Sequence, residues 1–316
     1  MKRLLGLACL TLCLSACQSS TLAFITNQGD DSVSVIDTRT YQVKKTIKVG
    51  KAPVGVAVSA KLKRAFITNV ESNDISVIDT DSLQLVDTIK TSSSPVGITI
   101  SPDSYKLYIT DWFSNKVLEI NTSNYQIRRE VIVETAPAGL IVSPDNKVLY
   151  VSTRDSNEIA VINTSNLTIT NRIKVGHHPF GITLSNDGKT LYAVNVYDDT
   201  VSIIDMLQPT SIPKTVKVKN HPYCATVSPD NKMLYVTNTQ DDTVSVIDLA
   251  NHQTKAIIDV GMTPEGIQYD AQNQQVLVAN WGTNEVSIID IKTNKVTKSI
   301  KTGDKSRAFG QFILMK

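Results

Sequence analysis

The fold of this 316-residue chain follows from one repeated pair of motifs, which stands at 235–238 as Tyr-Val-Thr-Asn and at 241–248 as Asp-Asp-Thr-Val-Ser-Val-Ile-Asp. Close variants of the first motif recur every 42 or 43 residues, at 24–27, 66–69, 108–111, 150–153, 192–195, 235–238 and 277–280. A variant of the second motif follows each of them. Self-similarity at a fixed period of this size indicates a repeat architecture. Seven units fill the chain from about residue 22 to its end, which leaves no room for a second domain.

Each unit is expected to form four short β-strands. Val, Ile, Thr and Tyr dominate runs of four to seven residues, and Gly, Pro, Asp, Asn and Ser separate the runs. In the fourth unit the predicted strands are 149–152, 159–163, 169–175 and 180–185. No segment of the repeat keeps a helical period. Four strands in 42 residues is typical of a β-propeller blade.

An Asp or Asn closes the second motif of every unit and is expected to cap a turn, because its side chain can accept hydrogen bonds from nearby backbone N–H groups. These residues are Asp37, Asp79, Asn121, Asn163, Asp205, Asp248 and Asp290.

The phase of the repeat predicts how the ring closes. If the first strand of a unit is a segment such as 55–59, then 24–27 is a second strand whose own unit lacks a first one. The C-terminal segment 309–314 is a first strand with no successor, so it can complete the N-terminal blade and remove an open sheet edge. The sequence therefore predicts an all-β, seven-bladed β-propeller over 22–316. Each blade has four antiparallel strands, and the C-terminal strand pairs with the N-terminal blade.

The N-terminus has the features of an export signal. Two basic residues precede an apolar run at 4–14, which is shorter than the roughly 20 residues that span a membrane. Leu14-Ser15-Ala16-Cys17 resembles a bacterial lipobox, which implies cleavage before Cys17 and acylation of that residue. A plain signal peptide cut near Ala16 is the alternative. The expected organisation is a lipoprotein signal at 1–16, an acylated anchor and short tether at 17–21, and the propeller at 22–316.

Charge and cysteine content exclude several classes of protein. The chain has 32 basic and 30 acidic residues, and loss of Lys2 and Arg3 with the signal leaves 30 of each. A neutral chain has no overall electrostatic attraction for nucleic acid. After removal of the signal and acylation of Cys17, Cys224 is the only free cysteine, so no disulfide is available and a buried structural role is expected. No motif indicates a cofactor, and we expect a monomer.

These repeated motifs, together with Ser-Pro-Asp-Asn-Lys at 228–232, resemble those of the YVTN-repeat β-propellers of bacteria and archaea. The resemblance covers about 22–316 and implies the propeller fold and an extracytoplasmic or surface location. Related propellers carry haem or quinone cofactors or act as hydrolases, and the shared repeat does not select among these functions. Gln18, next to the acylated residue, favours the outer membrane, facing the periplasm, if the host is Gram-negative.

Departures from the repeat mark a candidate site on one face, where two sets of loops meet. The position after the first motif holds both tryptophans, Trp112 and Trp281, which could form a ligand platform or fill gaps between blades. A second set of loops contains a recurring proline. The residues that follow this position are Val54, Val96, Ala138, Phe180, Tyr223, Glu265 and Arg307. His178 and His221 precede two successive prolines.

The candidate ligand-binding residues are Trp112, Trp281, Phe180, Tyr223, His178, His221, Glu265 and Arg307. Two imidazoles could bind a metal or, when protonated, an anion, but no third ligand is evident and no metal site is assigned. Glu265 and Arg307 could equally form an ion pair. The acidic loops at 30–31, 198–199 and 241–242 resemble cation ligands but are explained more simply as tight turns.

We expect a membrane-anchored binding or protein-interaction module without catalysis, whose envelope ligand or partner is not identified by the sequence. A propeller-type hydrolase or lyase with its site at the channel mouth is the alternative. The tether at 18–21 reaches roughly 15–20 Å, so the face opposite the candidate site is expected to lie against the membrane.

Overall fold

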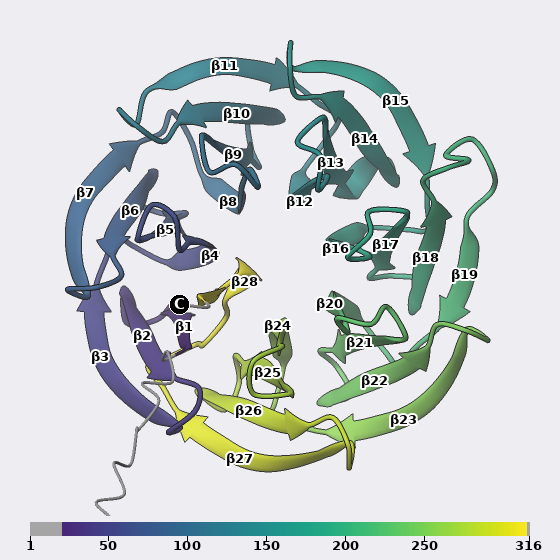
Figure 1. The fold of residues 1–316 in the computed structure, drawn as a ribbon. Helices are drawn as coiled ribbons and strands as arrows, with labels where there is room; N and C mark the ends of the chain where they lie inside the picture. The colour runs from purple at the N-terminus through teal and green to yellow at the C-terminus, as the bar shows by residue number, and fades with distance from the viewer. Residues whose placement is uncertain (1–20, 315–316) are drawn as a thin grey trace, which may run out of the picture.

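The computed structural model describes residues 21–314, which form a ring of seven β-sheets around a central axis (Figure 1). The predicted signal peptide, Cys17 and the first four residues of the segment 17–21 lie outside the described residues. Within 21–314 the only helical segment is a single 3₁₀ turn, η1 (Arg154–Ser156). No helix in the described part of the chain is long and apolar enough to cross a membrane.

Every blade contains an inner, a second, a third and an outer strand, paired in that order. The inner strands are β4 (Pro53–Ser59), β8 (Pro95–Ile100), β12 (Pro137–Val142), β16 (Pro179–Leu184), β20 (Pro222–Val227), β24 (Pro264–Asp270) and the closing pair β28 (Phe309–Gln311) and β29 (Ile313–Leu314). The second strands are β1 (Leu22–Asn27), β5 (Arg64–Asn69), β9 (Lys106–Asp111), β13 (Val148–Thr153), β17 (Thr190–Asn195), β21 (Met233–Asn238) and β25 (Gln275–Asn280).

The remaining strands form the outer half of each blade. The third strands are β2 (Ser32–Asp37), β6 (Asp74–Asp79), β10 (Lys116–Asn121), β14 (Glu158–Asn163), β18 (Thr200–Asp205), β22 (Thr243–Asp248) and β26 (Glu285–Asp290). The outer strands are β3 (Gln42–Lys48), β7 (Gln84–Lys90), β11 (Ile127–Ile132), β15 (Thr168–Lys174), β19 (Lys214–Lys217), β23 (Gln253–Asp259) and β27 (Lys295–Lys301). The predicted strands of the fourth unit are confirmed to within two residues.

The core lies between neighbouring blades. All six residues of β2 are buried, whereas most of β3 is exposed at the rim of the ring. One core cluster joins Phe66 and Ile75 of one blade to Ile98, Leu107 and Ile109 of the next. Sheets that are covered on both faces keep apolar residues on both sides of a strand, which is why the repeated motifs are continuously apolar.

The Thr of the first motif joins adjacent blades near the axis. Thr68 Oγ1 accepts a hydrogen bond from the Gly55 N–H at 2.7 Å and donates one to the Val96 carbonyl of the next blade at 2.9 Å. The inner strands approach so closely that a Cβ at Gly97 would lie 2.1 Å from the Ala138 carbonyl oxygen. Glycine is therefore needed at this point of the repeat.

The seven predicted turn caps are confirmed. Asp37 Oδ1, for example, accepts hydrogen bonds from the backbone N–H groups of Arg39 and Thr40, both at 3.1 Å. The other six residues accept equivalent bonds in their own turns. The repeated acids are scaffold residues, as the sequence indicated.

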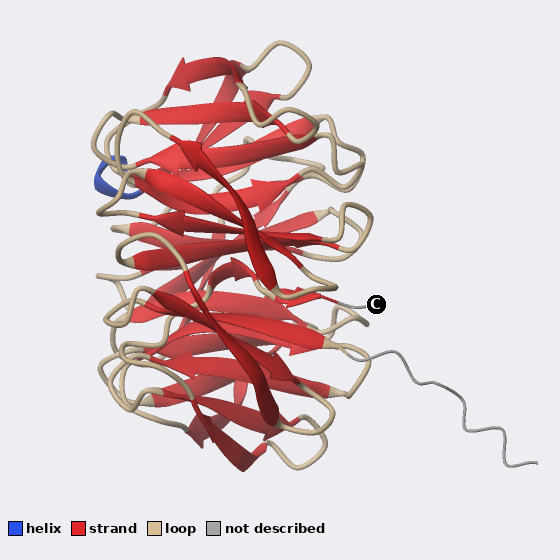
Figure 2. Cartoon of the chain, turned by 90° about the vertical axis from the view of Figure 1, so that its left-hand side faces the viewer, coloured by secondary structure: helices blue, strands red, loops and turns tan. Residues whose placement is uncertain are grey.

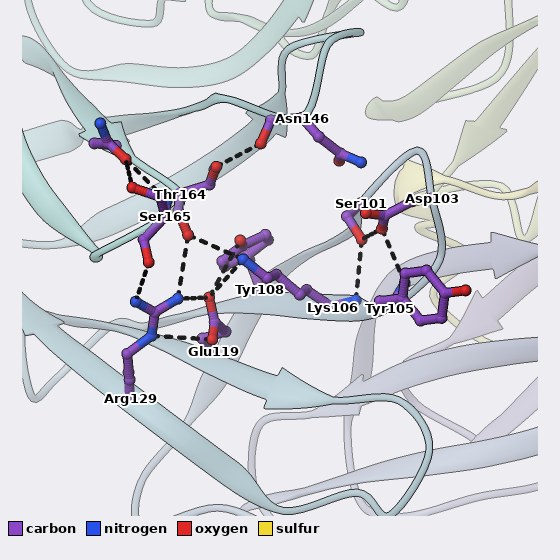
Figure 3. A network of polar contacts seen from close by, with 11 residues as sticks. Ser101, Asp103, Tyr105, Lys106, Tyr108, Glu119, Arg129, Asn146, Thr164 and Ser165 are labelled. Atoms are coloured by element: carbon purple, nitrogen blue, oxygen red, sulfur yellow. Dashed lines mark hydrogen bonds and ion pairs between the residues drawn. The ribbon is translucent and has the colours of Figure 1, made fainter.

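A polar network joins the third and fourth blades away from the axis (Figure 3). Glu119 of β10 is wholly buried, and its carboxylate accepts bonds from Arg129 Nε at 3.1 Å and Nη2 at 2.6 Å. Arg129 also donates to the Ser165 carbonyl at 2.7 Å, and Lys106 donates to the Thr164 carbonyl at 2.9 Å. The hydrogen bonds to Glu119 raise the pKa of Arg129 above its ordinary value. The buried carboxylate of Glu119 thus pairs with Arg129 and Lys106, and both cations donate hydrogen bonds to carbonyls of the next blade.

The ring closes through the C-terminus, as predicted. β29 pairs antiparallel with β1 through Ala23–Ile313 and Leu22–Leu314, and Phe24 N–H donates to the Phe312 carbonyl at 2.9 Å. The prediction of one continuous strand at 309–314 is wrong, because β28 leaves the N-terminal blade and pairs in parallel with β4. Gly310 permits the bend: its φ is +114°, and a Cβ there would lie 2.5 Å from the Val56 carbonyl oxygen. Figure 1 shows β28 inside the ring.

Candidate functional site

The predicted site residues all lie on one face of the ring, at the end of the central channel where the inner strands begin. We call this end the mouth. It is surrounded by the loops between second and third strands and the loops that lead into the inner strands. Figure 2 shows η1, which belongs to the first set, on this face. The opposite face, where β1 begins and the inner strands turn into the second strands, we call the tether face.

The loops at the mouth hold one another in place across blade boundaries. His178 and His221 have φ of 54° and 55°, and the same left-handed position is taken by Ala52, Ala136, Thr263 and Lys305. The N–H of His178 donates to Asn157 Oδ1 at 2.9 Å, and that of His221 donates to Asp199 Oδ1 at 2.8 Å. Asp31 and Asp242 accept the equivalent bonds elsewhere. These acids serve turns, as the simpler sequence interpretation held.

The floor of the mouth is a stack of aromatic rings. Phe180 stacks on Tyr223 with ring centroids 4.2 Å apart, and the ring centroid of Phe309 lies 4.9 Å from that of Phe180. Trp112 lies 6.1 Å from Phe180 and is partly exposed. Offset rings at these separations attract one another beyond their burial alone. Phe309 comes from the closing segment, so closure of the ring also completes this aromatic cluster.

Glu265 and Arg307 form an ion pair beside this floor, which was one of the two roles that the sequence predicted for these charges. Arg307 Nε donates to Glu265 Oε2, and Nη2 donates to the Tyr223 hydroxyl at 2.7 Å. Gln28 Oε1 accepts from Arg307 Nη1 at 3.4 Å and from Trp281 Nε1 at 3.2 Å. Each of the three guanidinium nitrogens of Arg307 therefore already donates one hydrogen bond.

Burial governs the titration of this group of side chains. It raises the pKa of Glu265, against the opposing effect of Arg307. Burial alone would lower the pKa of Arg307, but the charge of Glu265 more than offsets this and raises it. Burial also raises the pKa of Tyr223. Of the two carboxylate oxygens of Glu265, Oε2 accepts the hydrogen bond from Arg307.

The ring of Tyr197 lies close to both histidines. Its ring centroid is 4.0 Å from that of His178 and 5.8 Å from that of His221. Burial lowers the pKa of both imidazoles, and Arg154 lowers each further. Among residues 21–314, no three His, Cys, Asp or Glu side chains gather as a metal site. The interpretation of the pair as facing metal ligands is therefore not supported by the geometry.

Arg154 is the residue at the mouth that the sequence did not place in the site. Its guanidinium carbon lies 5.5 Å from the Trp112 ring centroid and 5.9 Å from that of Tyr197. Among the residues that the structure describes, it donates one hydrogen bond, from Nη1 to Asp155 Oδ1 at 3.0 Å. A weak signal was available, because Arg154 occupies the same repeat position as Trp112 and Trp281. The orientation of its guanidinium between two rings is a tertiary contact.

Both tryptophans line the mouth but on different sides of it. Trp112 packs against the aromatic floor, whereas Trp281 bonds to Gln28 and has Lys305 Nζ 5.3 Å from its ring centroid. Cys224, expected to be buried, is buried beneath the floor, and burial raises the pKa of its thiol. That thiol is not an activated nucleophile.

Comparison with protein families agrees with this architecture. The family model described as lactonase, seven-bladed β-propeller matches residues 19–212 and 208–307. The chain belongs to this family. No curated protein sequence matches the chain.

Solved structures share the fold at low sequence identity. Hydrazine synthase of Kuenenia stuttgartiensis superposes with a TM-score of 0.76 at 21% identity, covering 84% of this chain and 91% of that one. A functionally unknown protein from Desulfotomaculum acetoxidans has a TM-score of 0.78 at 15% identity, covering 92% and 99%. The dihydro-heme d1 dehydrogenase NirN has a TM-score of 0.68 at 14% identity, covering 89% of this chain and 63% of its own. At these identities the likeness concerns the fold alone.

Proposed function

We propose that this chain is an envelope lipoprotein of the YVTN-repeat type that binds a ligand at the mouth and does not transform it. The arrangement of Arg154 supports this most directly. Its guanidinium lies between two partly exposed rings and keeps donors that no described residue occupies. Rings offer a flat apolar surface, and free guanidinium donors suit a carboxylate or phosphate. The proposed ligand is therefore a planar molecule that carries a negative charge.

The other charged groups at the mouth favour binding over catalysis. Glu265 and Arg307 are paired with each other, and Cys224 lies beneath the floor with a raised thiol pKa. A hydrolase needs an activated nucleophile or a base within reach of a water molecule.

A thermal-shift and calorimetric screen of aromatic carboxylates, sugar phosphates, peptides and oligonucleotides tests the proposal. Arg154→Gln and Trp112→Ala are expected to weaken any stabilising anionic ligand at least tenfold. Lys116→Gln, on the third strand of the blade that carries Trp112, breaks only the pair with Glu130 of the outer strand and serves as the control, which should leave binding unchanged. A ligand that binds with the same affinity to the parent protein, Arg154→Gln and Trp112→Ala would contradict the proposed binding site at the mouth.

Lactone hydrolysis is the second candidate, because the family takes its name from that activity and burial keeps the imidazoles of His178 and His221 neutral at physiological pH. A neutral imidazole can act as a general base. Turnover of any member of a lactone panel, lost in His178→Asn or His221→Asn but retained in Lys116→Gln, would replace the binding proposal with this one.

The proposed lipid anchor also predicts how the ring is oriented relative to the membrane. Acylated Cys17 would hold the tether face against the membrane and leave the mouth open to the periplasm. When the membrane-bound protein is treated with an amine-reactive label, Lys51 and Lys305 near the mouth should react faster than Lys61 and Lys63 on the tether face. Equal labelling of both pairs, or incorporation of palmitate that survives Cys17→Ser, contradicts this arrangement.

A further inference from the structure

A cavity occupies the central channel below the aromatic floor, at the tether face. Its volume is about 520 Å³, which is within the range of small-ligand sites. All seven blades contribute to its wall, from the level of Gly139 and Gly181 down to the turns near Asn186 and Pro229. Phe309 and Gly310 of the closing segment line it too and separate it from the mouth.

The wall of this cavity is neutral and partly polar. No Asp, Glu, Lys or Arg is among the residues that line it. The hydroxyls of Thr99 and Thr183 line it and make no hydrogen bond within the described chain. Gln268 accepts bonds from the N–H groups of Phe312 at 2.6 Å and Ile313 at 2.8 Å, which leaves its amide nitrogen free to donate. A charged ligand would be desolvated here without a counter-charge.

The main chain supplies further recognition groups. Within residues 21–314, β8, β12, β16, β20 and β24 each end a four-stranded sheet, so their axial edges pair with no other strand. The edge of β4 shows what such an edge accepts, because β28 pairs with it in parallel inside the channel. Unpaired strand edges bind extended peptide backbones in the same way.

One blade has a smaller side chain than the others at the level of the cavity. One position of the inner strand lines the cavity in six of the seven blades, where it holds Ile98, Leu140, Ile182, Ala225, Ile267 and Phe309. Ala225 is the one small residue in the set, and it lies in the cavity wall. Space is therefore left beside β20, opposite the edge that β28 already covers.

We propose that this cavity binds a short, uncharged, peptide-like ligand, whose amides pair with an inner-strand edge and whose aliphatic groups contact the apolar wall. The site is separate from the mouth and does not depend on the function proposed for it. The ligand enters from the tether face, because the aromatic floor closes the other end.

Calorimetry with the blocked tripeptide N-acetyl-Ala-Val-Ala-amide tests the proposal, using residues 18–316, which include the whole described ring. Ala225→Ile restores the residue type of the repeat and fills the space, and is expected to weaken binding at least tenfold without loss of stability. Thr183→Val keeps the shape and removes a hydroxyl, and should weaken binding roughly threefold to tenfold. Trp112→Ala, at the mouth, should have no effect.

Three results would overturn the proposal. One is the absence of binding at millimolar peptide. Another is binding that is unchanged in both Ala225→Ile and Thr183→Val or that is lost in Trp112→Ala. The third is equal affinity for the matched peptide with a central Asp, because a neutral wall must discriminate against that charge.

Discussion

Replacing Glu119 by valine tests how the third blade is fastened to the fourth. Equivalent positions in the other six blades hold Val35, Val77, Val161, Ile203, Val246 and Ile288, so the new side chain suits the site sterically. Glu119 has no exposed side-chain surface, whereas Arg129 and Lys106 are 30% and 25% exposed. The carboxylate is the one charge in the network that water cannot reach.

The difference in exposure between Glu119 and its two cations determines how much each substitution is expected to lower the free energy of unfolding. Glu119→Val leaves the Tyr108 hydroxyl without its acceptor at 3.3 Å, but both cations recover some hydration. Removing one partner of a buried pair costs about 3–5 kcal/mol, and partial exposure of the cations should reduce this to about 2–3 kcal/mol. Arg129→Ala leaves the buried carboxylate with Lys106, at 3.5 Å, as its remaining cation and also frees the Ser165 carbonyl, so about 3–5 kcal/mol is expected.

The double variant decides between an interacting pair and two independent losses. Glu119→Val with Arg129→Ala removes both charges and should cost at least about 2 kcal/mol less than the sum of the single changes. Urea denaturation of residues 18–316 measures all three free energies of unfolding. Glu130→Gln breaks the exposed Lys116–Glu130 pair and should change stability by less than about 0.5 kcal/mol. Additive single effects, or Arg129→Ala milder than Glu119→Val, would refute the reasoning.

Three further predictions concern titration, close packing and ring closure. Burial holds the pKa of His221 below its unfolded value of about 6.5, so the folded state binds fewer protons and stability falls as the pH drops below that value. His221→Asn, which tolerates the left-handed backbone, should reduce the fall in the urea midpoint between about pH 7.5 and 5.5; an unchanged slope contradicts this. Gly97→Ala places a methyl group 2.1 Å from a backbone oxygen and should cost about 1–3 kcal/mol, and a midpoint equal to that of the parent would show that the inner strands can separate freely. Deleting 312–316 removes three buried apolar side chains, each worth about 1.5–3 kcal/mol, and opens a sheet edge, so size-exclusion chromatography should show aggregation rather than a stable monomer.

The features carried by the repeat can be predicted from the sequence because each is decided within one unit of about 42 residues. The strand pattern, the turn caps and the phase that assigns the C-terminus to the first blade all follow from local chemistry repeated seven times. The same comparison located the mouth, since departures from a repeat are visible without coordinates. Glu119 also departs from it, where every other unit has Val or Ile, but its partner Arg129 is fixed only by strand pairing.

Tertiary structure decided what depends on contacts between units. Arg154 sits between Trp112 and Tyr197 because three different blades converge at the mouth, and no spacing in the chain encodes that meeting. The bend at Gly310 could not be foreseen either, because β28 gains a partner on β4 only once the ring exists. Local propensity selects strands and turns, whereas closure of the whole ring determines which strand edges remain free to pair.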